Sequence, residues 1–310
     1  MKYIVTGGAG FIGSHIVEEL ANRQHEVIIL DNLFSGKQEN IEQFLSCPGV
    51  TFVKGSITNP RLLKETFAGA DGVFHLGAIA SVPRSVADPT ETHDVNLTGT
   101  LNVLIAARDC NVKKVIFSST AAIYGNNPAL PKSESMIPET QSPYAVTKIA
   151  GEQYGAIFSH LYGVKTVSLR YFNVFGPRQD PTSPYSGVIS RFIKNILTRQ
   201  PLEIYGDGKQ TRDFVFVKDV VRANLLAIES SAEGSFNIAC GKRIDLTELA
   251  AIVMEITGIT VPIIFKPPRE GDIRDSLADI TRARYAFGYE PEYTVKSGLE
   301  KTVAWYKSQL

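Results

Sequence analysis

Short apolar runs alternate with helical patterns of hydrophobic and polar positions through the first half of the chain. The runs that predict strands cover residues 2–7, 25–30, 50–55, 70–77, 113–119 and 164–170. Helical patterns lie between them, most clearly over residues 11–22, 94–108 and 143–162. Continuous apolar strands separated by helices are typical of a parallel sheet covered on both faces. The pattern therefore predicts an α/β fold with a Rossmann-type, doubly wound parallel sheet.

The pattern loosens after residue 175. Residues 176–187 are rich in Pro, Gly and Ser, which predicts a loop that leaves the sheet. We therefore expect a nucleotide-binding domain over residues 1–175, and a smaller, loop-rich substrate lobe over most of residues 176–310. The apolar run 235–240 predicts a buried strand that returns to the main sheet, so the boundary between the two parts is interleaved.

Composition narrows the class of protein. Among 310 residues, 44% are hydrophobic and 21% are charged, and the formal net charge is zero, so a nucleic-acid partner is not expected. The three cysteines are isolated without metal-ligand spacing, which predicts a reducing compartment and no metal. The N-terminus runs directly into a strand, and no apolar stretch is long enough to span a bilayer. We expect a cytoplasmic protein with no membrane partner.

A glycine-rich turn follows the first predicted strand. Gly7, Gly10 and Gly13 stand between this strand and a helix, where glycine permits a tight turn and close approach of the backbone to a pyrophosphate. The second predicted strand ends in Asp31, whose carboxylate can accept hydrogen bonds from ribose hydroxyls. No arginine follows it to accommodate a 2′-phosphate, so NAD is expected rather than NADP.

Tyr144 and Lys148 are four residues apart on the predicted helix 143–162, so their side chains share one face. A lysine ammonium beside a phenol stabilises the phenolate, and the spacing predicts a lowered pKa for Tyr144 and a role in proton transfer. A cluster of hydroxyl residues, 118–120, ends the preceding strand and supports the same site.

These motifs, in this order, resemble the extended short-chain dehydrogenase/reductase family over nearly the whole chain. The resemblance implies that Tyr144 is the acid/base, that Lys148 bonds the nicotinamide ribose and that Thr120 hydrogen-bonds the substrate hydroxyl. Ser56 stands where the family often has an aspartate that binds adenine, and serine can still hydrogen-bond the adenine amine. The resemblance further implies cofactor contacts from Phe11, Ile12, Asn32, Ser35, Gly36, Ile57, Leu76, Ala78, Ala80, Asn96, Ser118, Tyr171, Phe172 and Val174.

Within that family the chain is most similar to nucleotide-sugar 4-epimerases, in segments 81–89, 171–181, 206–214 and 269–280. In such enzymes the residues matching Asn173, Arg212 and Arg269 contact the substrate diphosphate, and the one matching Asp272 binds the uridine ribose. Arginine offers a planar fork of donors that suits phosphate oxygens. The remaining substrate contacts that the resemblance implies are Ser81, Arg84, Ser119, Gly187, Val188, Tyr205 and Ser276.

Two small-residue positions select among related chemistries. Ala121 and Ala122 follow Thr120, where dehydratases of the family carry an Asp-Glu pair and decarboxylases a glutamate. Alanine cannot move protons, which leaves reversible hydride transfer through a 4-keto sugar. Ser276 replaces a tyrosine that is frequent in glucose/galactose-restricted epimerases, and its small volume leaves room for a 2-acetamido group.

The sequence thus predicts an NAD-dependent 4-epimerase of UDP-hexoses, with UDP-GlcNAc and UDP-GalNAc preferred and UDP-Glc and UDP-Gal as further substrates. A UDP-uronate epimerase or 4,6-dehydratase on the same scaffold is one alternative, although the two alanines argue against the dehydratase. A non-catalytic, dinucleotide-sensing protein is the other. Apolar stripes on the helices 94–108 and 143–162 predict a homodimer, because family members pair these helices across a two-fold axis.

Overall fold

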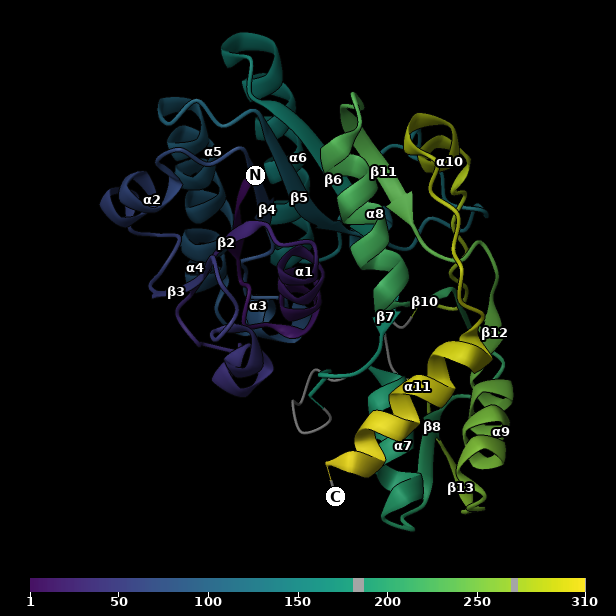
Figure 1. Ribbon diagram of the computed structural model, residues 1–310. Coiled ribbons are helices and arrows are strands. Elements are labelled where there is room, and N and C mark those ends of the chain that lie inside the picture. The colour runs from purple at the N-terminus through teal and green to yellow at the C-terminus, as the bar shows by residue number, and fades with distance from the viewer. Residues whose placement is uncertain (181–186, 269–272, 310) are drawn as a thin grey trace.

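A seven-stranded sheet forms the centre of the computed structural model, which describes residues 1–180, 187–268 and 273–309 (Figure 1). The strand order is β11-β6-β5-β4-β1-β2-β3, and every neighbouring pair is parallel. The strands are β1 (Lys2–Thr6), β2 (Glu26–Asp31), β3 (Val50–Lys54), β4 (Gly72–His75), β5 (Lys114–Thr120), β6 (Lys165–Tyr171) and β11 (Gly234–Ile238). The predicted doubly wound parallel sheet is confirmed.

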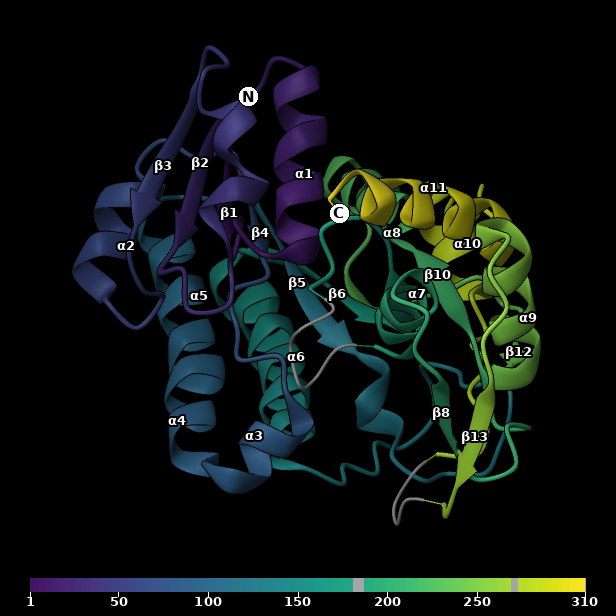
Figure 2. The same ribbon diagram turned by 90° about the horizontal axis from the view of Figure 1, so that it is seen from below.

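Helices cover both faces of this sheet. One face carries α1 (Phe11–Asn22) and α8 (Val217–Glu229), which pack against each other. The other carries α2 (Pro60–Phe67), α5 (Gly99–Asp109) and α6 (Pro143–Tyr162), with the short α3 (Val82–Ala87) and α4 (Pro89–His93) at their ends. Figure 2 shows the sheet between α1 and α8 on one side and α5 and α6 on the other. Because helices cover both faces, the central strands are rich in buried apolar residues, as the sequence pattern predicts.

The strand order reverses between β1 and β4. From β1 the chain winds outward to β2 and β3, and from β4 it winds the opposite way to β5 and β6. The loops that follow β1 and β4 therefore diverge and leave a crevice at the carboxyl ends of these strands, the usual position of a nucleotide in such sheets. Between α4 and α5 the helix continues as a π-helical turn, Asp94–Thr98, beside this crevice.

A second, smaller core lies in the C-terminal part of the chain, and its members include Phe192, Leu249 and Val303. Around it pack α7 (Val188–Leu197), α9 (Leu246–Thr257), α11 (Val295–Ser308) and the parallel pair β8 (Leu202–Tyr205) and β13 (Ile263–Lys266). Two short ladders join this lobe to the sheet: β7 (Asn173–Phe175) with β10 (Phe214–Phe216), and β9 (Thr211–Arg212) with β12 (Ile244–Asp245).

The chain crosses between the two parts more than once. After the lobe's first elements it returns through α8 to β11, which pairs with β6 at the edge of the main sheet and is covered by α10 (Thr281–Phe287). The predicted returning strand 235–240 is therefore found as β11 over residues 234–238, although it lies late in the sequence. Across residues 1–180, 187–268 and 273–309, no helix has the length and apolar character needed to cross a membrane.

Candidate active site

The turn after β1 depends on glycine for two separate reasons. Gly7 has a φ of 69°, which side chains other than glycine rarely adopt. A Cβ on Gly13 would lie 2.2 Å from the carbonyl oxygen of Gly7, so only glycine lets α1 approach the turn this closely. Gly10 is the N-cap of α1, and the first backbone N–H groups of the helix therefore face the crevice, where they favour an anion.

Asp31 ends β2 and holds this turn in place. Its carboxylate accepts hydrogen bonds from the backbone N–H groups of Ala9, at 3.0 Å, and Leu33, at 2.8 Å. Burial raises the pKa of Asp31, and the two hydrogen bonds oppose the rise. The side chain is 7% exposed and lines the cavity described next.

A cavity of about 790 Å³ occupies the crevice, bounded by the glycine turn, the ends of β2 and β3, the loop after β4, and α6. Its walls include most of the predicted cofactor contacts: Gly7, Gly10, Phe11, Ile12, Gly13, Asp31, Asn32, Ser35, Gly36, Ser56, Ile57, Leu76, Ala78, Ala80, Ser118, Tyr144, Lys148 and Tyr171. A glycine cradle, a helix N-terminus and an acid at the second strand end suit the pyrophosphate and ribose of NAD.

Tyr144 and Lys148 stand in the wall of this cavity on the first two turns of α6. Ser142 caps the helix by accepting a hydrogen bond from Ala145 N, and Pro143 is its first residue, which fixes where the helix starts. Lys148 Nζ donates to the carbonyl oxygen of Ser118 at 2.8 Å and lies 5.9 Å from the centre of the Tyr144 ring. Burial lowers the pKa of Lys148 to about 8, and the charge of Glu152 opposes this.

The lowered pKa predicted for Tyr144 is wrong for the protein without its ligands. Burial raises the pKa of this phenol to about 12, and only a hydrogen bond with Thr120 works in the other direction. Desolvation disfavours the phenolate more than a lysine 5.9 Å from the ring centre favours it. Without ligands the phenol of Tyr144 is therefore protonated at neutral pH.

The three hydroxyl residues at the end of β5 point in different directions. Thr120 hydrogen-bonds Tyr144 and accepts a bond from Ala122 N at 3.1 Å. Ser118 Oγ donates to Tyr171 Oη at 3.2 Å, on the α8 side of the sheet. Ser119 alternates to the α6 side, where its hydroxyl donates to the buried carboxylate of Glu152. The hydroxyl of Ser119, a predicted substrate contact, is therefore engaged within the protein.

Arg84 and Ser81, both predicted substrate contacts, also line the large cavity. The guanidinium of Arg84 forms a bidentate pair with Glu91, with N–O distances of 2.9 and 3.0 Å. It also stacks 4.5 Å from the centre of the Phe34 ring, which comes from the loop after β2. This stack bridges the two sides of the cavity.

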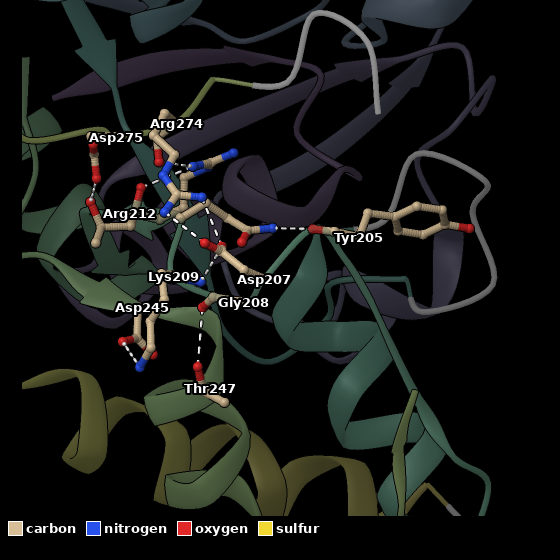
Figure 3. Close-up of polar contacts among 11 residues, drawn as sticks. Tyr205, Asp207, Gly208, Lys209, Arg212, Asp245, Thr247, Arg274 and Asp275 are labelled. Carbon is tan, nitrogen blue, oxygen red and sulfur yellow. Dashed lines mark hydrogen bonds and ion pairs between the residues drawn. The ribbon is translucent and has the colours of Figure 1, made fainter. Parts of the chain in front are cut away.

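A second cavity of about 250 Å³ lies in the C-terminal lobe, and Gln179 and Gly187 line both cavities. Its walls include the predicted contacts Asn173, Val174, Gly187, Val188, Tyr205 and Arg212. Arg212 Nη1 donates to the carbonyl oxygens of Thr211, at 2.9 Å, and Arg274, at 3.3 Å. Arg274 in turn is paired with Asp207 at 2.7 Å, and the Tyr205 ring points away from this group (Figure 3).

Some predicted site residues lie elsewhere. Asn96 is buried behind the cavity wall, where its side chain bonds both the N–H and the C=O of Ile79. Phe172 is buried, and Ser276 is half-buried beside β9 with its N–H bonded to Thr211 O at 3.1 Å. Arg269 and Asp272 lie outside the residues that the structure describes.

Comparison with known proteins identifies the family. Residues 3–239 match the model of the NAD dependent epimerase/dehydratase family. The chain belongs to this family. The family resemblance predicted from the motifs is confirmed, and so is NAD as the cofactor, which the large cavity fits.

Relatives in this family match the chain along its full length. A putative UDP-glucose 4-epimerase of Methanocaldococcus jannaschii is 40% identical, and the match covers 98% of both chains. A UDP-glucose 4-epimerase of Mycolicibacterium smegmatis is 39% identical, and the match covers 100% of this chain and 99% of the relative. The solved structure of the UDP-N-acetylglucosamine 4-epimerase of Methanobrevibacter ruminantium, in complex with UDP-N-acetylmuramic acid, is 42% identical with a TM-score of 0.96. The match covers 100% of this chain and 99% of that one. The Thermus thermophilus UDP-glucose 4-epimerase complex with NAD is 39% identical with a TM-score of 0.90, over 100% of both.

Sequence reasoning missed several groups of this epimerase/dehydratase site. Gln179 joins the two cavities, Phe34 stacks on Arg84, and Asp207 holds Arg274 next to Arg212. No spacing rule connects such distant positions. Glu152 could have been found, because it continues the four-residue spacing of Tyr144 and Lys148 on the same helix.

Proposed function

We propose that the protein is an NAD-dependent 4-epimerase of UDP-hexoses that prefers UDP-GlcNAc and UDP-GalNAc. The observation that carries this proposal is the junction of the two cavities. Tyr144 and Lys148 line the cavity that suits NAD, and Arg212 and Asn173 line an adjoining cavity that suits a nucleoside diphosphate. The relatives named for 4-epimerisation of UDP-sugars support the same reaction.

NAD, held by the glycine turn and Asp31, would supply reversible hydride transfer at C4 of the sugar. Tyr144 takes the proton of the C4 hydroxyl and later gives it back, while Thr120 orients that hydroxyl. The hydrogen bond with Thr120 opposes the burial that raises the pKa of Tyr144, and the ammonium of Lys148 and a cationic nicotinamide would add positive charge near the phenolate. Ala121 and Ala122 add no acid or base, so the 4-keto sugar loses no water and is reduced again.

Inversion at C4 requires the keto sugar to present its other face before the hydride returns. Asn173 and Arg212, the polar side chains that would hold the diphosphate, line the smaller cavity. A firm hold on UDP and a loose hold on the sugar allow the sugar to turn about the diphosphate link. The small side chain of Ser276 supports a preference for 2-acetamido sugars.

The activity is tested by incubating the NAD-loaded protein separately with UDP-Glc, UDP-Gal, UDP-GlcNAc, UDP-GalNAc and UDP-glucuronate, and following each product by NMR. We expect interconversion of the two N-acetyl sugars at the highest kcat/KM, and turnover reduced by roughly 10²–10⁴-fold in the matched Tyr144→Phe protein. Turnover of UDP-glucuronate alone would instead identify a uronate epimerase. Binding of NAD with no turnover of any sugar would favour the non-catalytic alternative.

We also propose a homodimer built on α5 and α6. Apolar side chains on the outer face of α6 remain 47–62% exposed, namely Val146, Ile157 and Leu161. A second copy of the chain would cover this stripe with the same stripe of its own. Light scattering at micromolar concentration should give twice the chain mass, and Leu161→Glu should give monomers. A monomeric parent protein would contradict the dimer.

A further inference from the structure

A buried carboxylate lies directly behind the catalytic pair. Glu152 follows Lys148 by one turn of α6, as Lys148 follows Tyr144, and its side chain is 4% exposed. Three strands of the sheet donate to it. Ser119 of β5 donates its hydroxyl, Ser235 of β11 donates at 2.7 Å, and Arg170 of β6 donates from Nε and Nη2 at 3.0 and 2.7 Å.

The same network reaches the segment that follows Thr120. Arg170 Nη1 donates to Tyr124 Oη at 2.9 Å, and Tyr124 Oη donates to Asn237 Oδ1 at 2.6 Å. Tyr124 belongs to the 3-10 turn, Ala121–Tyr124, that Thr120 caps. One charged pair therefore connects the catalytic helix, the strand end that bears Thr120, and the returning strand β11.

Stability alone is a weak reason for such a pair. The free energy lost when two charges are removed from water is about as large as the free energy gained from their attraction. Well-packed apolar residues in place of a buried ion pair frequently give a protein that is equally stable. The Glu152–Arg170 pair, however, lies one helical turn from Lys148, where the charge of Glu152 acts on the ammonium. Around Lys148 the titratable and charged groups are Tyr144 and Glu152 on α6, Arg170 through its pair with Glu152, and His75 on β4.

Of these groups, Glu152 is the one that stabilises the ammonium. Burial holds the pKa of His75 at about 3, so His75 is neutral. Tyr144 is neutral in the absence of ligands, and the guanidinium of Arg170 is bound to the carboxylate of Glu152. Burial favours the neutral amine of Lys148, and the charge of Glu152 opposes it.

We propose that Glu152, fixed by Arg170 and Ser119, is a positioning residue that keeps Lys148 charged and aimed at the Tyr144 site at working pH. The inference rests on the proposed function for its kinetic consequence. Its structural consequence, the charge state of Lys148, does not depend on the substrate. In this account the hydroxyl of Ser119 helps to hold the carboxylate of Glu152 in place on α6.

The test compares Glu152→Gln with the charge-conserving Glu152→Asp in the NAD-loaded full chain. In the parent, kcat should fall above the pKa of Lys148. In Glu152→Gln this alkaline limb should move to lower pH by about one unit, the usual effect of removing a nearby opposite charge. In Glu152→Asp the limb should stay near its position in the parent protein. A Glu152→Gln enzyme slowed equally at every pH would overturn the proposal, because a merely structural role scales kcat without moving the limb.

One further measurement and two further variants keep the test decisive. The pH dependence of NAD affinity reports Lys148 without any sugar turnover, and it should shift in the same direction. A parent protein that turns over no UDP-sugar yet shows this shift would refute the proposed function and leave the role of Glu152 standing. If Glu152→Gln does not fold, the double variant Glu152→Gln/Arg170→Gln, in which both side chains are neutral, replaces it. An unmoved alkaline limb in that variant counts against the proposal.

Ser235→Ala is the control. It removes a hydrogen-bond donor to the same carboxylate from β11, and it should leave the alkaline limb in place.

Discussion

Lys148 Nζ donates a 2.8 Å hydrogen bond to the carbonyl oxygen of Ser118 and lies 5.9 Å from the centre of the Tyr144 ring. The backbone of β5 thus fixes the ammonium in the wall of the large cavity, which the phenol also lines. Since electrostatic effects are stronger in such a site than in water, small changes in charge around this pair should have large kinetic effects.

Tyr144→Phe removes the proton-transfer hydroxyl and keeps the ring. We expect kcat to fall by roughly 10²–10⁴-fold, the usual contribution of a positioned acid/base group. The affinity for UDP, measured by calorimetry, should change by less than about twofold, because the nucleotide cavity is lined by other residues. Near-normal turnover in the variant would remove Tyr144 from the mechanism.

Activity should also depend on the protonation of Lys148. Burial lowers its pKa to about 8, so the ammonium is present below this pH and lost above it. If the ammonium is required, kcat falls about tenfold per pH unit above pH 8. Lys148→Arg, whose guanidinium stays charged, should be slower at neutral pH yet lack this alkaline limb. An identical limb in both proteins would assign it to another group.

The sequence predicted the parallel sheet, and it placed the glycine turn beside the end of β2, because both follow from local patterns. The strand–glycine–helix order and the acid at the end of β2 are encoded within about 30 residues, and the glycine geometry at Gly7 and Gly13 is what such motifs require. The four-residue spacing likewise placed Tyr144 and Lys148 together on α6.

Long-range contacts and burial could not be derived from the sequence. The pKa of Tyr144 depends on desolvation, which no spacing rule measures, and the partner of Ser119 depends on which face of β5 each hydroxyl occupies. The Asp207–Arg274 pair joins positions 67 residues apart. Such groups become visible only when the chain is folded.

Gly13→Ala tests the close approach of α1 to the turn. The new Cβ would lie 2.2 Å from Gly7 O and 2.8 Å from Gly8 Cα, both backbone atoms that cannot move aside cheaply. We expect the free energy of unfolding in urea to fall by about 1–3 kcal/mol, as for overpacked sites, and NAD affinity to fall with it. Gly10→Ala is the matched control, because its Cβ would meet Gly7 O at 3.1 Å and should alter stability much less. Equal loss of stability in the two variants would contradict the steric account.

Ser276→Tyr tests the proposed preference for N-acetyl sugars. Ser276 is half-buried, and its N–H is bonded to Thr211 on β9, next to Arg212, so a larger side chain here projects from a fixed backbone position. If that volume receives the 2-acetamido group, the phenol should reduce kcat/KM for UDP-GlcNAc relative to UDP-Glc by roughly 5- to 150-fold, since overpacking a fitted site costs about 1–3 kcal/mol. Ser276→Ala, which adds no volume, should leave the ratio of the two substrates near its parent value. Equal losses of kcat/KM for both sugars in Ser276→Tyr would mean that the tyrosine only disturbs the lobe. A parent enzyme that turns over UDP-Glc much faster than UDP-GlcNAc would refute the volume argument itself.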